Sequence, residues 1–92
     1  MAKIRAHVFV SGIVQGVFLR QETKQQAENH GVNGWVHNLD DGRVEAVFEG
    51  GETDVKALID FCRKGPKGAQ ITNVEIEFEK FSGEFQNFKV VY

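Results

Sequence analysis

The stretch that decides the fold is VNGWVHNLDDGRVEAVFEG, residues 32–50. Two segments rich in apolar residues flank Asp41 and Gly42, a pair suited to the positive φ angles of a tight hairpin turn. The second segment alternates apolar with charged side chains, and only an outward Val47 interrupts it: Val44, Ala46 and Phe48 stand against Arg43, Glu45 and Glu49. We therefore predict a β-hairpin with one face turned to a core.

A strand and a helix are predicted on the N-terminal side of this hairpin. Residues 3–10 alternate, with Ile4, Ala6, Val8 and Val10 pointing one way, as in a half-buried strand. Residues 20–30 are good helix formers, and Gly31 suits the position just past a helix end. The apolar stripe of this helix is thin and consists of Leu19, Thr23 and Ala27.

A helix and two strands are predicted on the C-terminal side. Residues 51–65, GETDVKALIDFCRKG, carry an apolar stripe at helical spacing, with Glu52 or Thr53 as the cap: Val55, Leu58, Ile59 and Cys62. In ITNVEIEFEKF, residues 71–81, apolar and acidic side chains alternate, so that Val74, Ile76 and Phe78 point inward and Glu75, Glu77 and Glu79 outward. A last short strand follows, with Phe88, Val90 and Tyr92 on one side.

The element order β-α-β-β-α-β, followed by the short terminal strand, predicts an α+β fold of the ferredoxin-like, split-βαβ type. We expect a single domain over residues 1–92, an antiparallel sheet of strand order 4-1-3-2, and both helices on one face of it. This strand order sets the acidic row beside basic residues of the first strand: Glu75, Glu77 and Glu79 face Lys3, Arg5 and His7. Such exposed pairs are favourable but weak.

Composition excludes several classes of function. The chain has 92 residues and a formal net charge of −2, so it lacks the basic field that holds nucleic acid. No apolar run is long enough to span a bilayer, and the first residues lack the shape of a signal peptide. A single cysteine cannot form an internal disulfide. We expect a monomeric cytoplasmic domain that binds neither nucleic acid nor a membrane.

The loop SGIVQGVFLR, residues 11–20, falls between the first strand and the first helix. Gly12 and Gly16 allow the backbone to curl so that several unpaired N–H groups converge on one point near a helix N-terminus, which attracts anions. Arg20 adds a planar fork of donors suited to phosphate oxygens, although a cation here opposes the helix dipole unless an anion is bound. Spacing alone leaves two interpretations with equal weight, an oxyanion cradle and an ordinary turn with a surface arginine.

Two motifs in this chain, GIVQGVFLR at residues 12–20 and GWVHNLDDGRVE at residues 34–45, together resemble the paired signature of the acylphosphatase family. That family has a G-x-V-Q-G-V-x-[aromatic]-R loop and a G-[aromatic]-V-x-N…G-x-V-E segment on the next strand. The resemblance extends over nearly the whole chain. It implies hydrolysis of acyl phosphates, mixed anhydrides of a carboxylic and phosphoric acid, to a carboxylate and inorganic phosphate, with no metal or other cofactor.

Carried onto this chain, the resemblance implies roles for residues of both motifs. Arg20 would bind the phosphate and Asn38 would orient the attacking water, while backbone N–H groups line the cradle at Gln15, Gly16, Val17, Phe18 and Leu19. Leu19 replaces the family's aromatic residue and His37 its Arg or Lys, and we expect both departures to alter the rim of the site. In its predicted strand Asn38 shares a face with Gly34 and Val36, the side turned to the helices and the loop.

Other candidate groups are weaker. His7, His30 and His37 are scattered and form no metal-ligand pattern, and we expect His37 to point away from Asn38. Cys62 belongs to an apolar stripe, where packing is expected in place of nucleophilic chemistry. The alternative function is a non-catalytic, ferredoxin-like regulatory module that binds phosphate in the same cradle, because the fold alone does not decide between them.

Overall fold

The computed structural model describes residues 2–16 and 18–92. The elements follow the predicted order: β1 (Lys3–Ile13), α1 (Leu19–His30), β2 (Asn33–Asn38), β3 (Val44–Gly51), α2 (Glu52–Lys64), β4 (Gln70–Glu79) and β5 (Phe88–Val90). β1 runs on to Ile13, past the predicted end at Val10, which shortens the loop that follows it. α1 ends at the predicted place, where Gly31 adopts φ 68°.

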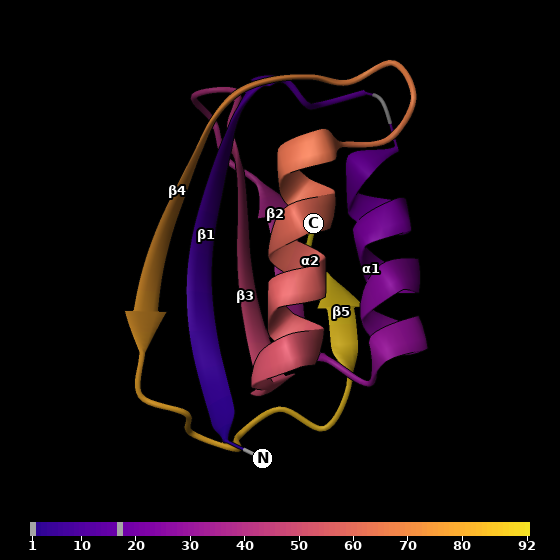
Figure 1. Ribbon diagram of the computed structural model, residues 1–92. Helices are drawn as coiled ribbons and strands as arrows, with labels where there is room; N and C mark the ends of the chain where they lie inside the picture. Colours follow the sequence, from indigo (N-terminus) through magenta and orange to yellow (C-terminus); the bar gives the residue numbers. More distant parts are fainter. Residues whose placement is uncertain (1, 17) are drawn as a thin grey trace.

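All strands belong to one sheet of order β4-β1-β3-β2-β5. The predicted antiparallel order 4-1-3-2 is confirmed, because β1 pairs with β3 and β4, and β2 pairs with β3. The terminal strand extends the sheet by pairing with β2 in parallel, in the register Val36↔Val90. Both helices cover one face of the sheet (Figure 1), so the ferredoxin-like α+β fold is confirmed.

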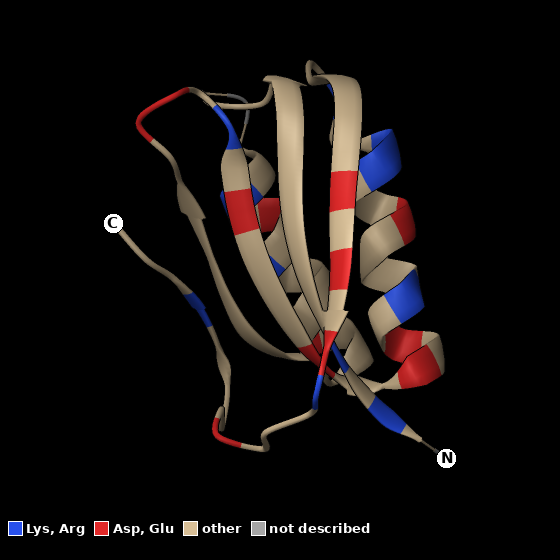
Figure 2. Cartoon of the chain, turned by 90° about the vertical axis from the view of Figure 1, so that its left-hand side faces the viewer, with Lys and Arg blue, Asp and Glu red and all other residues tan. Residues whose placement is uncertain are grey.

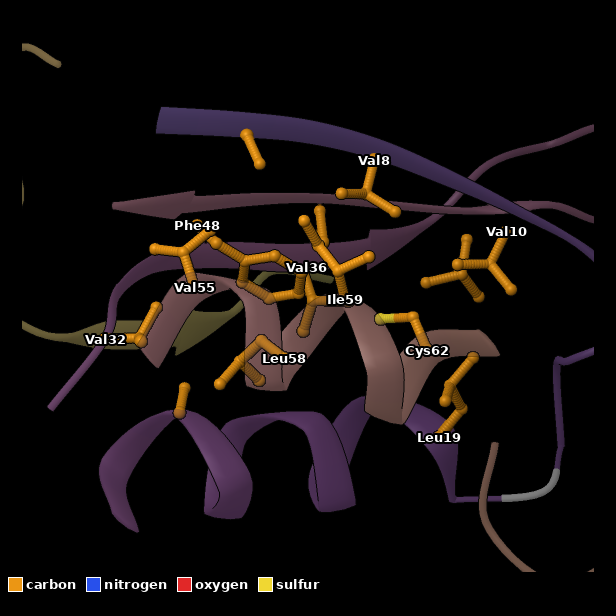
Figure 3. Packing of buried hydrophobic residues seen from close by; sticks show 14 of the residues in the cluster. Val8, Val10, Leu19, Val32, Val36, Phe48, Val55, Leu58, Ile59 and Cys62 are labelled. Carbon is orange, nitrogen blue, oxygen red and sulfur yellow. The ribbon is translucent and has the colours of Figure 1, made fainter. Parts of the chain in front are cut away.

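The core fills the layer between the sheet and the helices (Figure 3). The inward residues of β1 are fully or almost fully buried, and they meet the predicted stripe of α2 and the thin stripe of α1: Ala6, Val8, Val10, Val55, Leu58, Ile59, Cys62, Leu19, Thr23 and Ala27. Because side chains alternate along a strand, a slip of one residue in β1 would expose this set and bury charges instead. In the described part of the chain, neither helix has the length and hydropathy needed to cross a membrane.

Two local expectations are wrong. Phe78 points to the helix side as predicted but is not buried: it is 59% exposed, because β4 is the edge strand and the hollow between it and α2, lined by Ile59 and Phe78, is open to solvent. Neither Glu52 nor Thr53 caps α2, whose N-cap residue is Gly51 with no side-chain hydrogen bond. The backbone N–H of Glu52 donates instead to the carbonyl of Ala2 at 3.0 Å, so the start of the chain supplies the partner.

The predicted hairpin is confirmed between β2 and β3. Its turn closes where the N–H of Leu39 donates to the carbonyl of Arg43 at 2.8 Å, and Gly42 takes φ 96°. Gly34, in β2, has φ 140°, and a Cβ there would lie 1.8 Å from the carbonyl oxygen of Val47. Only glycine therefore lets β2 approach β3 at this point, which fixes the path of β2 toward Asn38.

Figure 2 shows the open face of the sheet, where acidic positions lie along the edge strand β4. Arg5 lies opposite Glu79 and its Nε donates to that carboxylate at 2.9 Å, which confirms this pair. β4 ends at Glu79, so Lys3 lies beyond the acidic row and has no carboxylate opposite it. Val47 faces this side as predicted, yet it is 1% exposed, because its cross-strand neighbours are His7 and Trp35.

Glu49 anchors the segment 80–87, which crosses one end of the sheet from β4 to β5 (Figure 1). Its carboxylate is 2% exposed and accepts hydrogen bonds from Ser82 N at 2.9 Å, Ser82 Oγ at 2.8 Å, Gly83 N at 3.1 Å and Arg5 Nη1 at 3.1 Å. Burial acts to raise the pKa of Glu49, but the bonds from Ser82, Arg5 and Gly83 outweigh burial and lower that pKa below its ordinary value.

Acid should therefore loosen this crossing segment. A carboxyl whose pKa is lowered by folding stabilises the native state above its unfolded pKa of 4.5, and this contribution is lost as the pH falls through the folded pKa. We expect Glu49→Gln to lose about 1–3 kcal/mol of unfolding free energy at pH 7 and to respond less to acid than the parent protein below pH 4.5. Urea unfolding at several pH values measures both effects.

The matched control is Glu75→Gln, at an exposed position of β4 whose side chain makes no hydrogen bond within residues 2–16 and 18–92. It should leave stability at pH 7 nearly unchanged. Equal losses in the two variants would contradict a specific role for Glu49.

Candidate active site

Two buried side chains hold the ends of the loop between β1 and α1. Val14 and Leu19 are each 2% exposed and belong to the hydrophobic core, and Figure 3 shows Leu19 pointing into the layer below α2. The side chain of Leu19 faces the interior, but the residue also lines the cavity beside Arg20, so the expected effect of this departure on the rim stays a prediction. Its aliphatic side chain packs in the core at the first position of the helix, where the family motif described above has an aromatic residue.

The loop between these anchors is curled. Gly16 has φ 78°, and Phe18 has φ 61° in the left-handed region, which makes it the one non-glycine residue with positive φ in the part of the chain that the structure describes. Within that part, no acceptor pairs with the backbone N–H groups of Gln15, Gly16, Phe18 or Leu19. These predicted cradle donors are free to bind a ligand; Val17, the remaining one, lies outside the described residues.

Arg20 stands beside this curl, in the first turn of α1. With Val14, Gly16, Phe18, Leu19 and Gln21 it lines a cavity of about 180 Å³. Within residues 2–16 and 18–92 its guanidinium makes no ion pair, while every other arginine pairs with a carboxylate: Arg5, Arg43 and Arg63. An unpaired cation at a helix N-terminus favours the binding of an anion. The cavity suits a group of phosphate size and is smaller than the roughly 300 Å³ at which drug-sized sites begin.

Asn38 ends β2 on the helix side of the sheet, as its shared face with Gly34 and the fully buried Val36 predicts. Its Oδ1 is buried and, among the described residues, is the one buried side-chain polar atom without a hydrogen-bond partner. Leaving such an acceptor unpaired costs about 1–3 kcal/mol, so the atom needs a ligand or a water. The adjacent turn contacts the loop directly, because Gln15 Nε2 donates to the carbonyls of Leu39 at 2.9 Å and Arg43 at 3.0 Å.

Tyr92 completes this end of the sheet. The parallel pairing of Val36 with Val90 places Asn38 and Tyr92 two residues further along neighbouring strands. The Tyr92 side chain is 90% exposed, and its ring lies 5.0 Å from Arg20 Cζ. A ring over the face of a guanidinium leaves the N–H groups at its edge available to oxygen ligands. The sequence alone does not place this ring, because its position depends on the register of β5.

The other predicted candidates lie away from the loop. His37 points to the open face, where its Nε2 is 2.6 Å from Glu45 Oε1, so it does not line the cavity beside Arg20. Burial raises the pKa of the Cys62 thiol to about 12, which keeps it protonated and confirms a packing role. Within the described residues no group of three or more His, Cys, Asp or Glu side chains is placed to hold a metal ion.

A larger cavity of about 380 Å³ lies between β2 and residues 84–87. Its charged lining residues, Glu84 and Lys89, have opposite signs, so it offers no net attraction for a dianion. The loop with Arg20 therefore remains the candidate for phosphate.

Comparisons with known proteins agree with this geometry. The family model for acylphosphatase matches residues 6–90. The chain belongs to the acylphosphatase family. It is 59% identical over 83 residues to an acylphosphatase of Haloarcula marismortui, covering 90% of this chain and 91% of the relative. It is 48% identical over 92 residues to an acylphosphatase of Pelotomaculum thermopropionicum, covering both chains completely.

Solved structures of acylphosphatases are similar in three dimensions. The crystal structure of the acylphosphatase from Bacillus subtilis has a TM-score of 0.92 and 29% identity, and the match covers 97% of this chain and 99% of that one. The acylphosphatase from Coxiella burnetii gives a TM-score of 0.91 at 36% identity, over 97% of this chain and 93% of that one. The predicted family is confirmed.

Phe18 holds a strained backbone in the loop between β1 and α1 and gains little from burial, since its side chain is 73% exposed. The left-handed conformation costs a residue with a bulky side chain about 1–2 kcal/mol, and asparagine tolerates it. We expect Phe18→Asn to raise the unfolding free energy by about 1 kcal/mol, or Tm by about 4–8 °C. Phe18→Val, which is β-branched, should lower Tm instead. A Phe18→Asn variant less stable than the parent would contradict this account.

Proposed function

We propose that Arg20 and the loop amides hold the phosphoryl group of an acyl phosphate while Asn38 holds the water that attacks it. The acylphosphatase family to which the chain belongs comprises hydrolases that act on acid anhydrides, and this chain is such a hydrolase. Its products are a carboxylate and inorganic phosphate. The roles of the individual residues within that reaction are what we propose.

The chemistry needs few groups, because the substrate carries a good leaving group. Cleavage of the bond between phosphorus and the acyl oxygen releases a carboxylate, which needs no strong acid to protonate it. The remaining tasks are to place a water in line with that bond and to stabilise negative charge on the phosphoryl oxygens. Donors aimed at those oxygens perform the second task without reorganising.

The observation that carries the proposal is the unpaired acceptor of Asn38. A buried Oδ1 without a partner can accept a hydrogen bond from a water, and the amide nitrogen of the same side chain can donate to that water or to the substrate. Unpaired donors of the loop and an unpaired guanidinium lie at the same end of the sheet. An acceptor for the water and donors for the phosphoryl group are the two parts that this hydrolysis requires.

We extend the proposal to the domain organisation, oligomeric state, location and partners of the protein. One core cluster joins residues from Ala6 to Phe88, which supports a single domain, and we propose that the protein acts as a monomer. Cys62, the lone cysteine, is free and buried, which agrees with a cytoplasmic location. The substrate is a small acyl phosphate, and neither nucleic acid nor a membrane takes part.

Arg20→Ala should weaken phosphate binding, because a charge-assisted hydrogen bond contributes about 1.5–3 kcal/mol, or about 10- to 150-fold in affinity. The inhibition constant of inorganic phosphate against benzoyl phosphate hydrolysis measures this loss. Arg20→Lys keeps the charge without the planar fork and should recover only part of it. Arg63→Ala, on the exposed side of α2, is the matched control and should bind phosphate normally. Unchanged phosphate inhibition in Arg20→Ala would refute the assignment.

Asn38→Ala should reduce turnover by about 100-fold or more while phosphate inhibition changes little, because the water loses its guide but the cradle stays intact. Asn73→Ala, at an exposed position of β4, is the matched control and should keep full turnover. Near-normal turnover in Asn38→Ala would exclude the water-positioning role. The parent protein is assayed without added metal, and no rate above background would favour the non-catalytic phosphate-binding module.

A further inference from the structure

The Gln15 side chain joins the loop to the hairpin that carries Asn38. Its Nε2 donates to two carbonyl oxygens, that of Leu39 at 2.9 Å and that of Arg43 at 3.0 Å. Leu39 directly follows Asn38, and Arg43 precedes Val44, the residue paired with Asn38 in the β2–β3 register. The two bonds therefore reach both sides of the turn next to the proposed water-binding amide.

This link is additional to the bonds that each part already has. The turn closes by itself, since Leu39 N–H donates to the carbonyl of Arg43, whose second lone pair then accepts from Gln15. The loop is held by its own buried anchors, Val14 and Leu19. Within residues 2–16 and 18–92, the Gln15 amide makes the only hydrogen bonds between residues 14–18 and the turn 39–43. Without it both parts keep their supports, but their relative position is no longer fixed by a bond.

We propose that Gln15 is a positioning residue that sets the location of the phosphate loop relative to Asn38. This inference rests on the proposed function, in which a water on Asn38 attacks a phosphorus atom held by the loop. In the proposed function the backbone N–H of Gln15 binds the phosphate, while its side chain donates to the hairpin, so one residue connects the phosphate loop with the turn next to Asn38. Reacting atoms must lie about 3–3.5 Å apart in line, and a misplacement of 1 Å can cost about 100-fold in rate.

A merely structural role and a positioning role differ in what they change. Loss of general stability would lower Tm and affect phosphate binding and turnover together. Loss of position would lower kcat while phosphate still binds to the loop, because the cradle donors and Arg20 are untouched. The loss of kcat would also depend on Asn38, since the position of the side chain that binds the water matters only when that side chain is present.

The test is a double-mutant cycle on the full chain, with benzoyl phosphate as substrate and inorganic phosphate as the binding probe. Gln15→Ala should lower kcat about 10- to 100-fold and change the phosphate inhibition constant less than about 3-fold. In the Asn38→Ala background, the same substitution should lower kcat less than about 3-fold further. Gln25→Ala is the matched control and should keep normal kcat, since Gln25 is exposed on α1 and makes no side-chain hydrogen bond in the described part of the chain.

Three outcomes would overturn the proposal: normal kcat in Gln15→Ala, phosphate affinity lost in proportion to kcat, or an equal further loss in the Asn38→Ala background. If Gln15→Ala does not fold by circular dichroism, Gln15→Met replaces it, since this side chain keeps the length and lacks the donors. Failure of the proposed function is recognised separately, because Asn38→Ala would then keep near-normal turnover whatever Gln15 does.

Discussion

The burial of Val14 and Leu19 is the constraint on which the site depends. Each side chain is sealed in the core, one after β1 and the other at the first residue of α1, so the chain must turn through the few residues between them. In that short path the backbone N–H groups of Gln15, Gly16 and Phe18 have no acceptor within residues 2–16 and 18–92. Apolar packing thus fixes both ends of a short segment whose described backbone N–H groups form no internal hydrogen bonds.

The same end of the sheet holds three local conflicts. Among the described residues they are an asparagine oxygen buried without a partner, a guanidinium without a carboxylate at a helix N-terminus, and a phenylalanine in the left-handed region. The unpaired oxygen costs about 1–3 kcal/mol and the left-handed backbone about 1–2 kcal/mol, whereas a cation against the helix dipole costs about 0.3–1 kcal/mol. A water would satisfy the oxygen and an anion would satisfy the guanidinium, and such conflicts gathered at one place indicate a binding site.

Sequence patterns predicted most of this fold because its elements are strongly periodic. The alternation in β1, β3 and β4 and the stripe Val55, Leu58, Ile59, Cys62 identify core faces that the structure confirms. Errors occurred where a residue depends on distant parts of the chain. The exposure of Phe78 follows from the reach of a helix over an edge strand, and the start of α2 is satisfied by Ala2, far away in sequence.

The residues of the candidate site could be proposed from the sequence, but the contacts between them could not. Glycine spacing and a family resemblance identified the loop, Arg20 and Asn38, whereas the contact of Tyr92 with Arg20 needs the parallel register of β5. The bonds of Gln15 to Leu39 and Arg43 bridge separations of 24 and 28 residues, which no local pattern encodes. The reaction follows from membership of the family, and the proposed role of each residue is argued from its contacts in the structure.

The position of β3 between β1 and β2 has a consequence for how such a protein is made. Every polar residue with a proposed role is already part of the chain once Asn38 is synthesised, but β1 and β2 meet only through β3, and β1 is flanked on its other side by β4. A nascent chain that ends at the hairpin turn therefore holds all the polar groups and lacks the strand that aligns them. Pairing between segments so far apart in sequence is slow to nucleate, since the intervening chain loses entropy before any contact forms. The alignment of Asn38 with the loop thus requires the completed sheet, and it is among the last properties that the growing polypeptide acquires.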